Sequence, residues 1–259
     1  MAARKKSRSR NRSAAPKRTS GKTAGPRTLA VDVGGTGVKA SVLDTRGNML
    51  HERVRIETPA DPTPQELVDI IIDLTKLLPP FDRVSVGFPG VINNGVVRTA
   101  PNLGTERFRG FDLASAVMKR VKKPVQVMND ADMQGYAAAR GKGVEMVITL
   151  GTGFGSSIFL DGRLGPHMEF AHHPFRKGET YEEQLGDEAR KKVGKKEWGK
   201  RVLKAIDTLR DLTNFDHIYV GGGNAQKLDV ELPSDASIVD NTAGILGGIR
   251  LWHDGTGSS

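Results

Sequence analysis

A carboxylate, three glycines and a threonine stand together near the start of the chain, in a spacing that suits phosphate chemistry. Asp32 ends an apolar run, and Gly34-Gly35-Thr36-Gly37 follows before a second apolar run begins at Val38. Two strands joined by so tight a glycine turn form a hairpin whose backbone N–H groups face outward with no Cβ in the way, which suits a phosphate. The Asp32 carboxylate and the Thr36 hydroxyl could then serve a magnesium shell and a phosphoryl oxygen. An ordinary β-hairpin is the alternative, because short glycine motifs also occur by chance.

A second copy of this pattern favours the phosphate interpretation. A shift of 117 residues places Leu29–Asp44 over Met146–Asp161 without a gap, and Gly34 then meets Gly151. Each segment has an apolar strand, a glycine turn, a second strand and a closing aspartate. The two hairpins, each opening one half of the chain, therefore predict two similar domains that face each other across a cleft, with a phosphate-bearing ligand between them.

The segment VQVMNDAD carries the strongest candidate for a catalytic base. Val125–Met128 reads as a strand and Ala131–Arg140 as a helix, so Asn129 and Asp130 lie at the junction. Aspartate is favoured as a helix N-cap, which is one interpretation of Asp130. The other is a general base that accepts the proton of an attacking hydroxyl group, as in kinases. With two phosphate-binding hairpins in the same chain, we favour the base.

An uncharged amide, Asn102, lies on the long loop that follows the strand predicted over Arg83–Phe88. Pro89-Gly90 turns the chain sharply at the carboxyl end of that strand, where open α/β sheets collect ligands. Asn102 could bind a sugar hydroxyl there, although a loop asparagine that bonds its own backbone is the commoner case.

The elements that must position these residues follow from apolar periodicity and turn signals. Thr63-Pro64-Gln65-Glu66 combines a capping box with proline at the first helical position, and the helix that it opens ends at Pro79-Pro80. We further expect a strand over Met49–Ile56, a helix over Asp112–Val121, a buried helical stripe of Leu203, Ile206, Leu209 and Leu212, a strand over His217–Val220, and a closing helix over Ala243–Trp252 that packs back on the first domain.

The composition is that of a protein without disulfides or membrane spans. The 259 residues include no cysteine and no apolar run long enough to cross a bilayer. The net charge of +9 arises in residues 1–27, which hold ten Lys and Arg and no acidic residue, whereas the remaining 29 basic and 30 acidic residues leave the body at −1. We expect this basic tail to be disordered, with a role either in gathering polyanions or in solubility, and we expect a cytoplasmic protein.

Five motifs, in their order along the chain, resemble the ROK family of sugar kinases and related regulators, and within it the polyphosphate glucokinase branch. They are DVGGTGVK, NDAD, LGTGFG at Leu150–Gly155, EFAH at Glu169–His172 and VGGGNA at Val220–Ala225. The resemblance covers about Leu29 to Trp252 and implies an α/β protein of the actin-like (ribonuclease H-type) fold, with its active site in the cleft between two similar domains. We place these domains at 28–135 and 136–259.

By position, the family pattern implies that Asp130 is the base toward the sugar 6-hydroxyl. It implies that sugar hydroxyls are bound by Asn102, Asn129, Glu169 and His172. Glu182 is a further candidate for a sugar ligand, and a solvated glutamate at the start of a helix is an equally good interpretation of it. Asp32 would hold Mg through water, and phosphates would lie against Asp32, Gly34, Gly35, Thr36, Gly37, Lys39, Gly151, Thr152, Gly153, Gly155, Gly221, Gly222 and Gly223.

The chain departs from the family where many members carry a cysteine-rich zinc motif. With no cysteine we expect no structural zinc, and a His172-His173 pair without acidic or thiolate partners favours a sugar contact over a metal site. The basic residues between Arg190 and Lys204 form either an ordinary solvated face or, for a long polyanionic donor, a guiding surface.

Together these expectations describe a sugar kinase that phosphorylates glucose at O6 with Mg, using inorganic polyphosphate and, as an additional donor, ATP. An ATP-dependent hexose or N-acetylhexosamine kinase of the ROK family is the alternative within that class. A non-catalytic sugar-sensing or polyanion-binding regulator is the alternative of another class, although residues 1–27 lack the apolar periodicity of a helix-turn-helix. We expect a homodimer, and neither a membrane nor nucleic acid as a partner.

Overall fold

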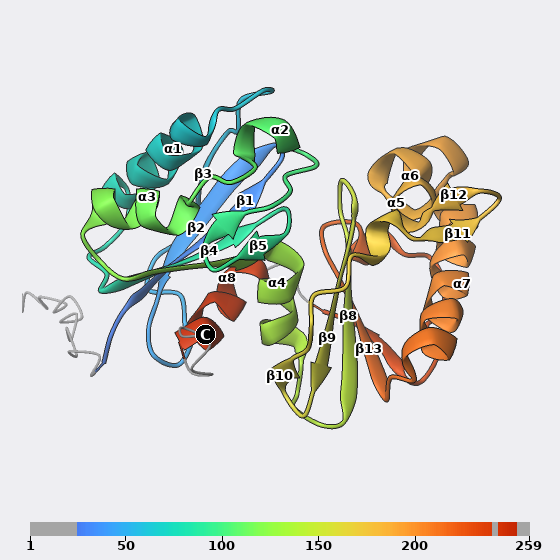
Figure 1. The fold of residues 1–259 in the computed structure, drawn as a ribbon. Helices are drawn as coiled ribbons and strands as arrows, with labels where there is room; N and C mark the ends of the chain where they lie inside the picture. The colour runs from blue at the N-terminus through green and yellow to red at the C-terminus, as the bar shows by residue number, and fades with distance from the viewer. Residues whose placement is uncertain (1–24, 240–242, 253–259) are drawn as a thin grey trace, which may run out of the picture.

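Two five-stranded sheets with the same strand pattern form the frame of the protein. In the computed structural model, which describes residues 25–239 and 243–252, the sheets have the orders β3-β2-β1-β4-β7 and β10-β9-β8-β13-β14 (Figure 1). β1 pairs antiparallel with β2 and parallel with β4, just as β8 pairs with β9 and β13. The strands are β1 Thr28–Gly34, β2 Gly37–Leu43, β3 Val54–Ile56, β4 Arg83–Phe88, β7 Val125–Asn129, β8 Val144–Leu150, β9 Phe154–Leu160, β10 Arg163–Leu164, β13 His217–Gly221 and β14 Ala236–Ile238.

The register of the two hairpins confirms the repeat expected from the sequence. β2 and β9 are related by the 117-residue shift at both ends, whereas β8 begins and ends one residue before the shifted β1. Gly34 pairs with Gly37 in the first hairpin and Leu150 with Phe154 in the second, so the turns hold two and three residues. Each glycine turn therefore occupies the corresponding corner of its own sheet.

Helix α1, Pro64–Lys76, covers one face of the first sheet together with α3, Leu113–Val121 (Figure 1). Thr63 caps α1 through the expected reciprocal capping box with Glu66. The apolar stripe of α1 is fully buried and joins α3 and the strands in one hydrophobic core, which holds Leu67, Val68, Ile71 and Leu74. This core fixes the first sheet beneath the cleft.

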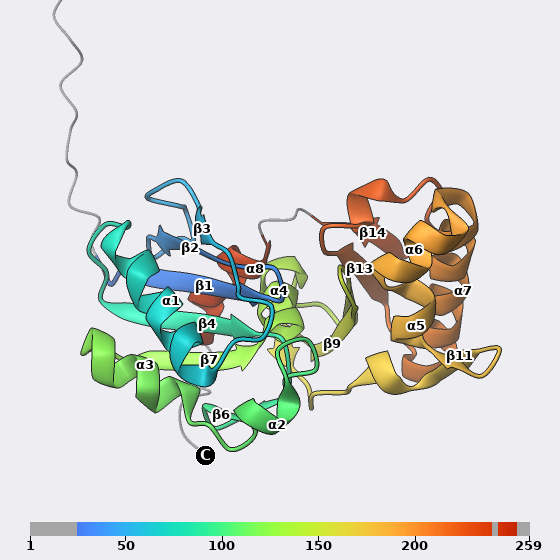
Figure 2. The same cartoon turned by 90° about the horizontal axis from the view of Figure 1, so that it is seen from above.

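Three helical segments fill the space between the two sheets (Figures 1 and 2). They are α4 Asp130–Ala138, α8 Ala243–Leu246 and the 3₁₀ helix η3 Gly247–Trp252. Both α8 and η3 pack against α4 and β1. Gly247 lies so close to α4 that a Cβ there would be 1.6 Å from the Met133 carbonyl oxygen. The Ser85 hydroxyl on β4 donates to the Gly248 carbonyl (2.6 Å) and accepts from the Trp252 indole (2.8 Å), which anchors this closing segment on the first sheet.

The helices of the second half gather beside its sheet, on the side away from α4 (Figure 2). They are α5 Tyr181–Leu185, α6 Asp187–Val193 and α7 Lys195–Thr213. The remaining short elements are β5 Ile92–Asn93, β6 Val96–Val97, α2 Thr105–Phe108, η1 Phe170–His172, β11 Pro174–Arg176, β12 Glu179–Thr180 and η2 Ala225–Lys227. A second hydrophobic core lies between α5, α7 and the second sheet.

Two predicted elements are shorter or differently wound than the sequence indicated. The strand expected over Met49–Ile56 is reduced to β3. The first residues of the expected strand belong instead to the turn after β2, and the Leu50 N–H donates to the Val42 carbonyl. The closing helix over Ala243–Trp252 changes from α to 3₁₀ winding at Gly247, where it approaches α4 most closely.

The buried stripe expected on α7 is wrong at its last position, and its first residue, Leu203, is only partly buried. Leu212 is 54 % exposed, because it lies off the buried face of α7, whereas its neighbour Thr213 reaches Met146 of the second core. The buried face includes Val202 and Ala205 beside the expected Ile206 and Leu209.

Two further expectations stay predictions. The basic tail was placed at residues 1–27, and residues 1–24 lie outside the part that the structure describes. The boundary between 28–135 and 136–259 is likewise untested, and it falls within α4. Among the described helices, none is long and apolar enough to cross a membrane.

Candidate active site

A cavity of about 230 Å³ lies between the two glycine turns and brings together residues from both sheets. The sequence-predicted residues that line it are Asp130, Asn102, Asn129, Glu169, His172, Glu182, Asp32, Gly34, Gly35, Thr36, Gly37, Lys39, Gly151, Thr152, Gly153, Gly155, Gly222 and Gly223. Gly221 is not among the lining residues; it ends β13, next to the side chains of Val239 and Gln134. The catalytic, sugar and phosphate candidates therefore share one space.

The first glycine turn is clamped from outside the cavity. Arg55 Nη2 donates to the Thr36 carbonyl (2.5 Å), and Thr58 Oγ1 donates to the Gly34 carbonyl (2.8 Å). A Cβ on Gly37 would lie 2.4 Å from Arg55 Nε, so glycine is what allows this approach. The clamp occupies two carbonyls and places a guanidinium charge beside the turn, which favours an anion on its other side.

The second glycine turn is braced by the segment that follows β13. Asn224 Nδ2 donates to the Gly151 carbonyl (2.9 Å), and the Gly151 N–H donates to the Gly153 carbonyl (3.1 Å). Gly222 has φ +88°, and a Cβ there would lie 2.4 Å from the Leu150 carbonyl oxygen, so only glycine fits that close approach. Open space adjoins Gly151 and Gly223, where a Cβ would meet nothing within 4 Å.

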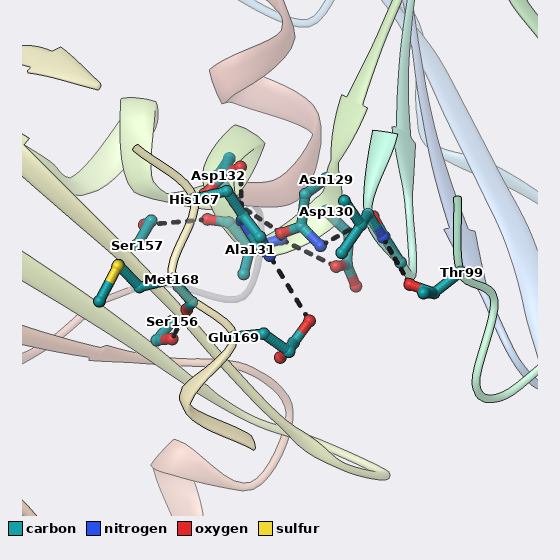
Figure 3. Close-up of polar contacts among 12 residues, drawn as sticks. Thr99, Asn129, Asp130, Ala131, Asp132, Ser156, Ser157, His167, Met168 and Glu169 are labelled. Atoms are coloured by element: carbon teal, nitrogen blue, oxygen red, sulfur yellow. Dashed lines mark hydrogen bonds and ion pairs between the residues drawn. The ribbon is translucent and has the colours of Figure 1, made fainter. Parts of the chain in front are cut away.

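Asn129, not Asp130, is the N-cap of α4. The Asn129 side-chain oxygen accepts from the N–H groups of Ala131 (2.8 Å) and Asp132 (3.1 Å), while its amide nitrogen donates to the Gly90 carbonyl (3.1 Å) (Figure 3). The helix-cap interpretation of Asp130 is therefore wrong. These hydrogen bonds of the Asn129 side chain hold β7, α4 and the Pro89-Gly90 loop together. They use one of its two amide hydrogens, so the other is available to a ligand.

Asp130 has an unusual carboxyl group. Burial raises the pKa of Asp130 to about 7, and the nearby negative charges of Asp32 and Asp132 add to the shift. Its carboxyl accepts hydrogen bonds only from backbone N–H groups of the described residues: that of Ala131 (2.9 Å) and its own. A carboxylate with a pKa near neutrality and free lone pairs facing a cavity is suited to accept a proton.

Asp32 brings a second carboxylate into the same cavity. Burial raises the pKa of Asp32, and the positive charges of Lys39 and Arg53 oppose the shift; Lys39 Nζ lies 4.0 Å from Asp32 Oδ2. Two poorly compensated carboxylates favour a cation between them and a phosphate. Within residues 25–239 and 243–252 no group of three or more His, Asp or Glu side chains could enclose a metal. A metal here would therefore rely on water and phosphate oxygens beside one carboxylate, which is how Mg²⁺ is commonly held.

The sugar candidates surround the rest of the cavity. Asn102 is exposed beside Gly35, and its amide makes no hydrogen bond to any residue that the structure describes. Glu169 precedes η1 and His172 ends it. Glu182 lies in the first turn of α5, with its carboxylate so near Gly153 that a Cβ there would be 2.8 Å from Oε2. These side chains offer amide, carboxylate and imidazole groups to a polyhydroxylated ligand.

The sequence prediction missed several residues of this region. Gln134 lines the cavity, and its position four residues after Asp130 on one helix face was a usable signal. Arg55 and His167 carried no such signal, because only the fold brings Arg55 to the first turn and His167 to Asp132.

The family model that matches this chain is that of the ROK family, over residues 28–179. The chain belongs to the ROK family. It is 30% identical over 257 residues to the polyphosphate glucokinase of Mycobacterium leprae (91% of this chain, 78% of the relative). It is 29% identical over 246 residues to that of Mycobacterium tuberculosis strain H37Rv (88% and 92%). The solved inorganic polyphosphate/ATP-glucomannokinase from Arthrobacter sp. strain KM superimposes with a TM-score of 0.80 at 30% identity, covering 88% of this chain and 100% of that one.

Membership of the ROK family confirms the resemblance drawn from the five motifs. The superposition on the Arthrobacter kinase, together with the repeated strand order, confirms the actin-like α/β fold. The roles of the individual site residues rest on the geometry described above and remain proposals.

Proposed function

We propose that this ROK-family chain phosphorylates glucose at O6, with inorganic polyphosphate as the phosphate donor and ATP as a second donor. The observation that carries the proposal is the Asp130 carboxyl, whose pKa lies near 7, in a cavity that two phosphate-type glycine turns and five sugar-binding candidates share. Relatives that match most of the chain are named polyphosphate glucokinases, which supports the same substrates here.

In the proposed reaction, Asp130 accepts the proton of the sugar 6-hydroxyl as O6 attacks the terminal phosphorus atom. The O6–P bond forms and the bridging P–O bond breaks, which leaves glucose 6-phosphate and a shortened polyphosphate or ADP. The two glycine turns hold the phosphates with backbone N–H groups, and Lys39 supplies a positive charge. Phosphoryl transfer needs little covalent help from a protein, so alignment and charge stabilisation are sufficient.

Magnesium fits the donor set of this site. Asp32 would hold it through water, beside the phosphate oxygens of the donor, and the ion would neutralise phosphate charge during transfer. The poorly compensated carboxylates of Asp32 and Asp130 are the feature of the structure that supports a cation here.

A basic surface beside the second glycine turn supports polyphosphate as the donor. Asp187 begins α6 and its N–H donates to the Thr152 carbonyl (3.2 Å), so α6 starts at the rim of the cavity. Further along, Lys192, Lys195 and Lys196 are exposed, and none has an ion pair with a described residue. Unpaired lysines in a row attract a long polyanion, and the attraction weakens as salt rises. We also propose a cytoplasmic homodimer, as expected from the sequence.

The test of this function is glucose phosphorylation with magnesium, with polyphosphate and ATP compared as donors. We expect turnover with both, and we expect kcat/KM for polyphosphate to fall about fivefold or more between low and moderate salt, because exposed charges are screened. A shortened chain that begins at Gly25 lacks most of the basic tail but keeps the hydrogen bonds between the Arg27 backbone and Asp82. Comparing it with the full chain therefore measures the contribution of the tail. Turnover with ATP alone would remove the polyphosphate assignment, and turnover with neither donor would remove the kinase assignment for glucose.

The pH profile of kcat gives a further prediction. Because the pKa of Asp130 is about 7, the base is protonated and inactive in acid and ionised above neutrality. We therefore expect kcat to fall roughly tenfold per pH unit below about pH 6.5 and to level off above pH 8. Measuring the profile with both donors distinguishes ionisation of the Asp130 carboxyl from ionisation of the donor phosphates. The fall in kcat that is due to Asp130 occurs at the same pH with either donor. A flat profile from pH 5 to 8 would contradict the assignment.

A further inference from the structure

His167 lies between two carboxylates that belong to different parts of the fold. Its Nδ1 is 3.0 Å from Asp132 Oδ2 on α4, and its Nε2 is 3.5 Å from Glu169 Oε2, which lines the cavity (Figure 3). Asp132 is only 5 % exposed, and its Oδ1 has no hydrogen-bond partner among the described residues. The three side chains form a continuous line from the buried side of α4 to the sugar candidate Glu169.

The ends of this line are held in place by backbone contacts. The Asp132 N–H is bound by the cap Asn129, so Asp132 and Asp130 share one rigid first turn of α4. On β9, the neighbouring hydroxyls of Ser156 and Ser157 reach opposite ways: Ser156 donates to the Met168 carbonyl (3.0 Å), and Ser157 to the Ala131 carbonyl (3.4 Å) (Figure 3). One strand thus fixes both the loop that carries His167 and the helix that carries Asp132.

The partners determine the charge of the His167 ring. Both ring nitrogens face carboxylates, and an imidazole can donate from both only when it is protonated at both. Hydrogen bonds to Asp132 and Glu169 raise the pKa of His167 to about 10, and His167 in turn lowers the pKa of Glu169. Burial acts in the other direction on Asp132 and raises its pKa. The titratable groups around the ring are Asp132 from α4 and Glu169 from its own loop, with His172 near Glu169.

We infer that His167 is a positioning residue for sugar recognition: anchored by Asp132, it fixes the Glu169 carboxylate in the orientation that accepts hydrogen bonds from the sugar. The inference rests on the proposed function, because it assigns Glu169 to a hydroxyl of the hexose. Its physical basis is that a carboxylate held by a cation on one oxygen keeps its other oxygen for the ligand.

The decisive variant is His167→Gln, which retains a polar side chain but cannot bridge both carboxylates with a positive charge. We expect the dissociation constant for glucose, measured by calorimetry, to rise about 30-fold, the range for a lost hydrogen bond to a charged group. The value of kcat should stay within about threefold, and the KM for the donor should not change, because the base and the phosphate turns are untouched. The matched control is His51→Gln, at an exposed histidine outside the cavity.

Glucose analogues that each lack one hydroxyl separate positioning from general damage. The penalty of His167→Gln should disappear for the analogue lacking the hydroxyl that Glu169 binds, and persist for the others. The double variant with Asp132→Asn should bind glucose no more weakly than His167→Gln alone, because Asp132 acts through His167. An unchanged dissociation constant, or an equal penalty for every analogue and for the donor, would overturn the inference.

A spectroscopic measurement keeps this test separate from that of the proposed function. In the full chain without any ligand, nuclear magnetic resonance of the His167 ring should show both nitrogens protonated at pH 8. In Asp132→Asn the ring should become neutral at a lower pH than in the original chain. A ring that is neutral at pH 8 in the original chain would refute the anchoring, whereas failure to phosphorylate glucose with an intact ring pair would refute only the proposed substrate. If another hexose is the substrate, the binding comparison is made with that hexose.

Discussion

Replacing Asp130 with asparagine should reduce kcat by about a thousandfold or more and leave the fold and glucose binding intact. General bases contribute factors of about 10² to 10⁴, and Asp130 lines the cavity with a carboxyl whose pKa is raised to about 7. Asparagine has almost the same shape, and its side-chain oxygen can still accept the Ala131 N–H. The measurement is kcat with each donor, with the dissociation constant for glucose from calorimetry.

The stability of Asp130→Asn supplies a second readout with a definite sign. Because the folded-state pKa of Asp130 is raised to about 7, this carboxyl lowers the free energy of unfolding as pH rises from about 4, the usual pKa of an aspartate, to about 7, and the loss is constant above that. Asparagine removes that cost, so at pH 8 the melting temperature should equal or exceed that of the original chain. Asp161→Asn is the matched control: it makes the same change in a β-turn at φ +49°, which asparagine tolerates, and should leave kcat unchanged. A near-normal kcat in Asp130→Asn would overturn the base assignment.

The features that the sequence could predict are those that local residue order determines. Each glycine turn lies between two apolar strands in the chain itself, so the 117-residue repeat was enough to predict both hairpins and their equivalent places. The capping box at Thr63 and the strand Arg83–Phe88 are local in the same sense. The family motifs then supplied the order of the site residues, and the cavity contains all of them except Gly221.

The features that the sequence could not predict depend on contacts between distant segments. The Gly90 carbonyl, 39 residues away, decides which of two adjacent polar residues caps α4. It binds the Asn129 amide, so that Asn129 and not Asp130 is the cap. His167 meets Asp132 across 35 residues, and Arg55 meets the first turn across 19. The 3₁₀ winding begins at Gly247, where the closing segment approaches Met133 on α4. The apolar periodicity of the closing segment itself does not predict this approach.

The largest loss of stability is expected for Trp198→Ala on α7. Trp198 is fully buried in the second core, and its indole N–H donates to the Leu185 carbonyl at the end of α5 (2.9 Å). Removing the ring leaves a cavity that costs about 3–5 kcal/mol, and the unpaired carbonyl adds about 1 kcal/mol. Trp198→Phe keeps most of the volume and loses the hydrogen bond, so it should cost about 1–2 kcal/mol.

Trp198→Ala should also loosen the lining of the active-site cavity, because Trp198 supports the short helix α5. The first turn of α5 carries Glu182 into the cavity, and Gly186 at its end is packed against Thr152 of the second glycine turn. Loosening α5 should therefore shorten the half-life of activity on mild heating, in step with the fall in melting temperature followed by circular dichroism. Leu212→Ala, at an exposed position in the last turn of the same helix, should change stability by no more than about 0.5 kcal/mol. Equal melting temperatures for Trp198→Ala and Leu212→Ala would show that the second core does not depend on this ring.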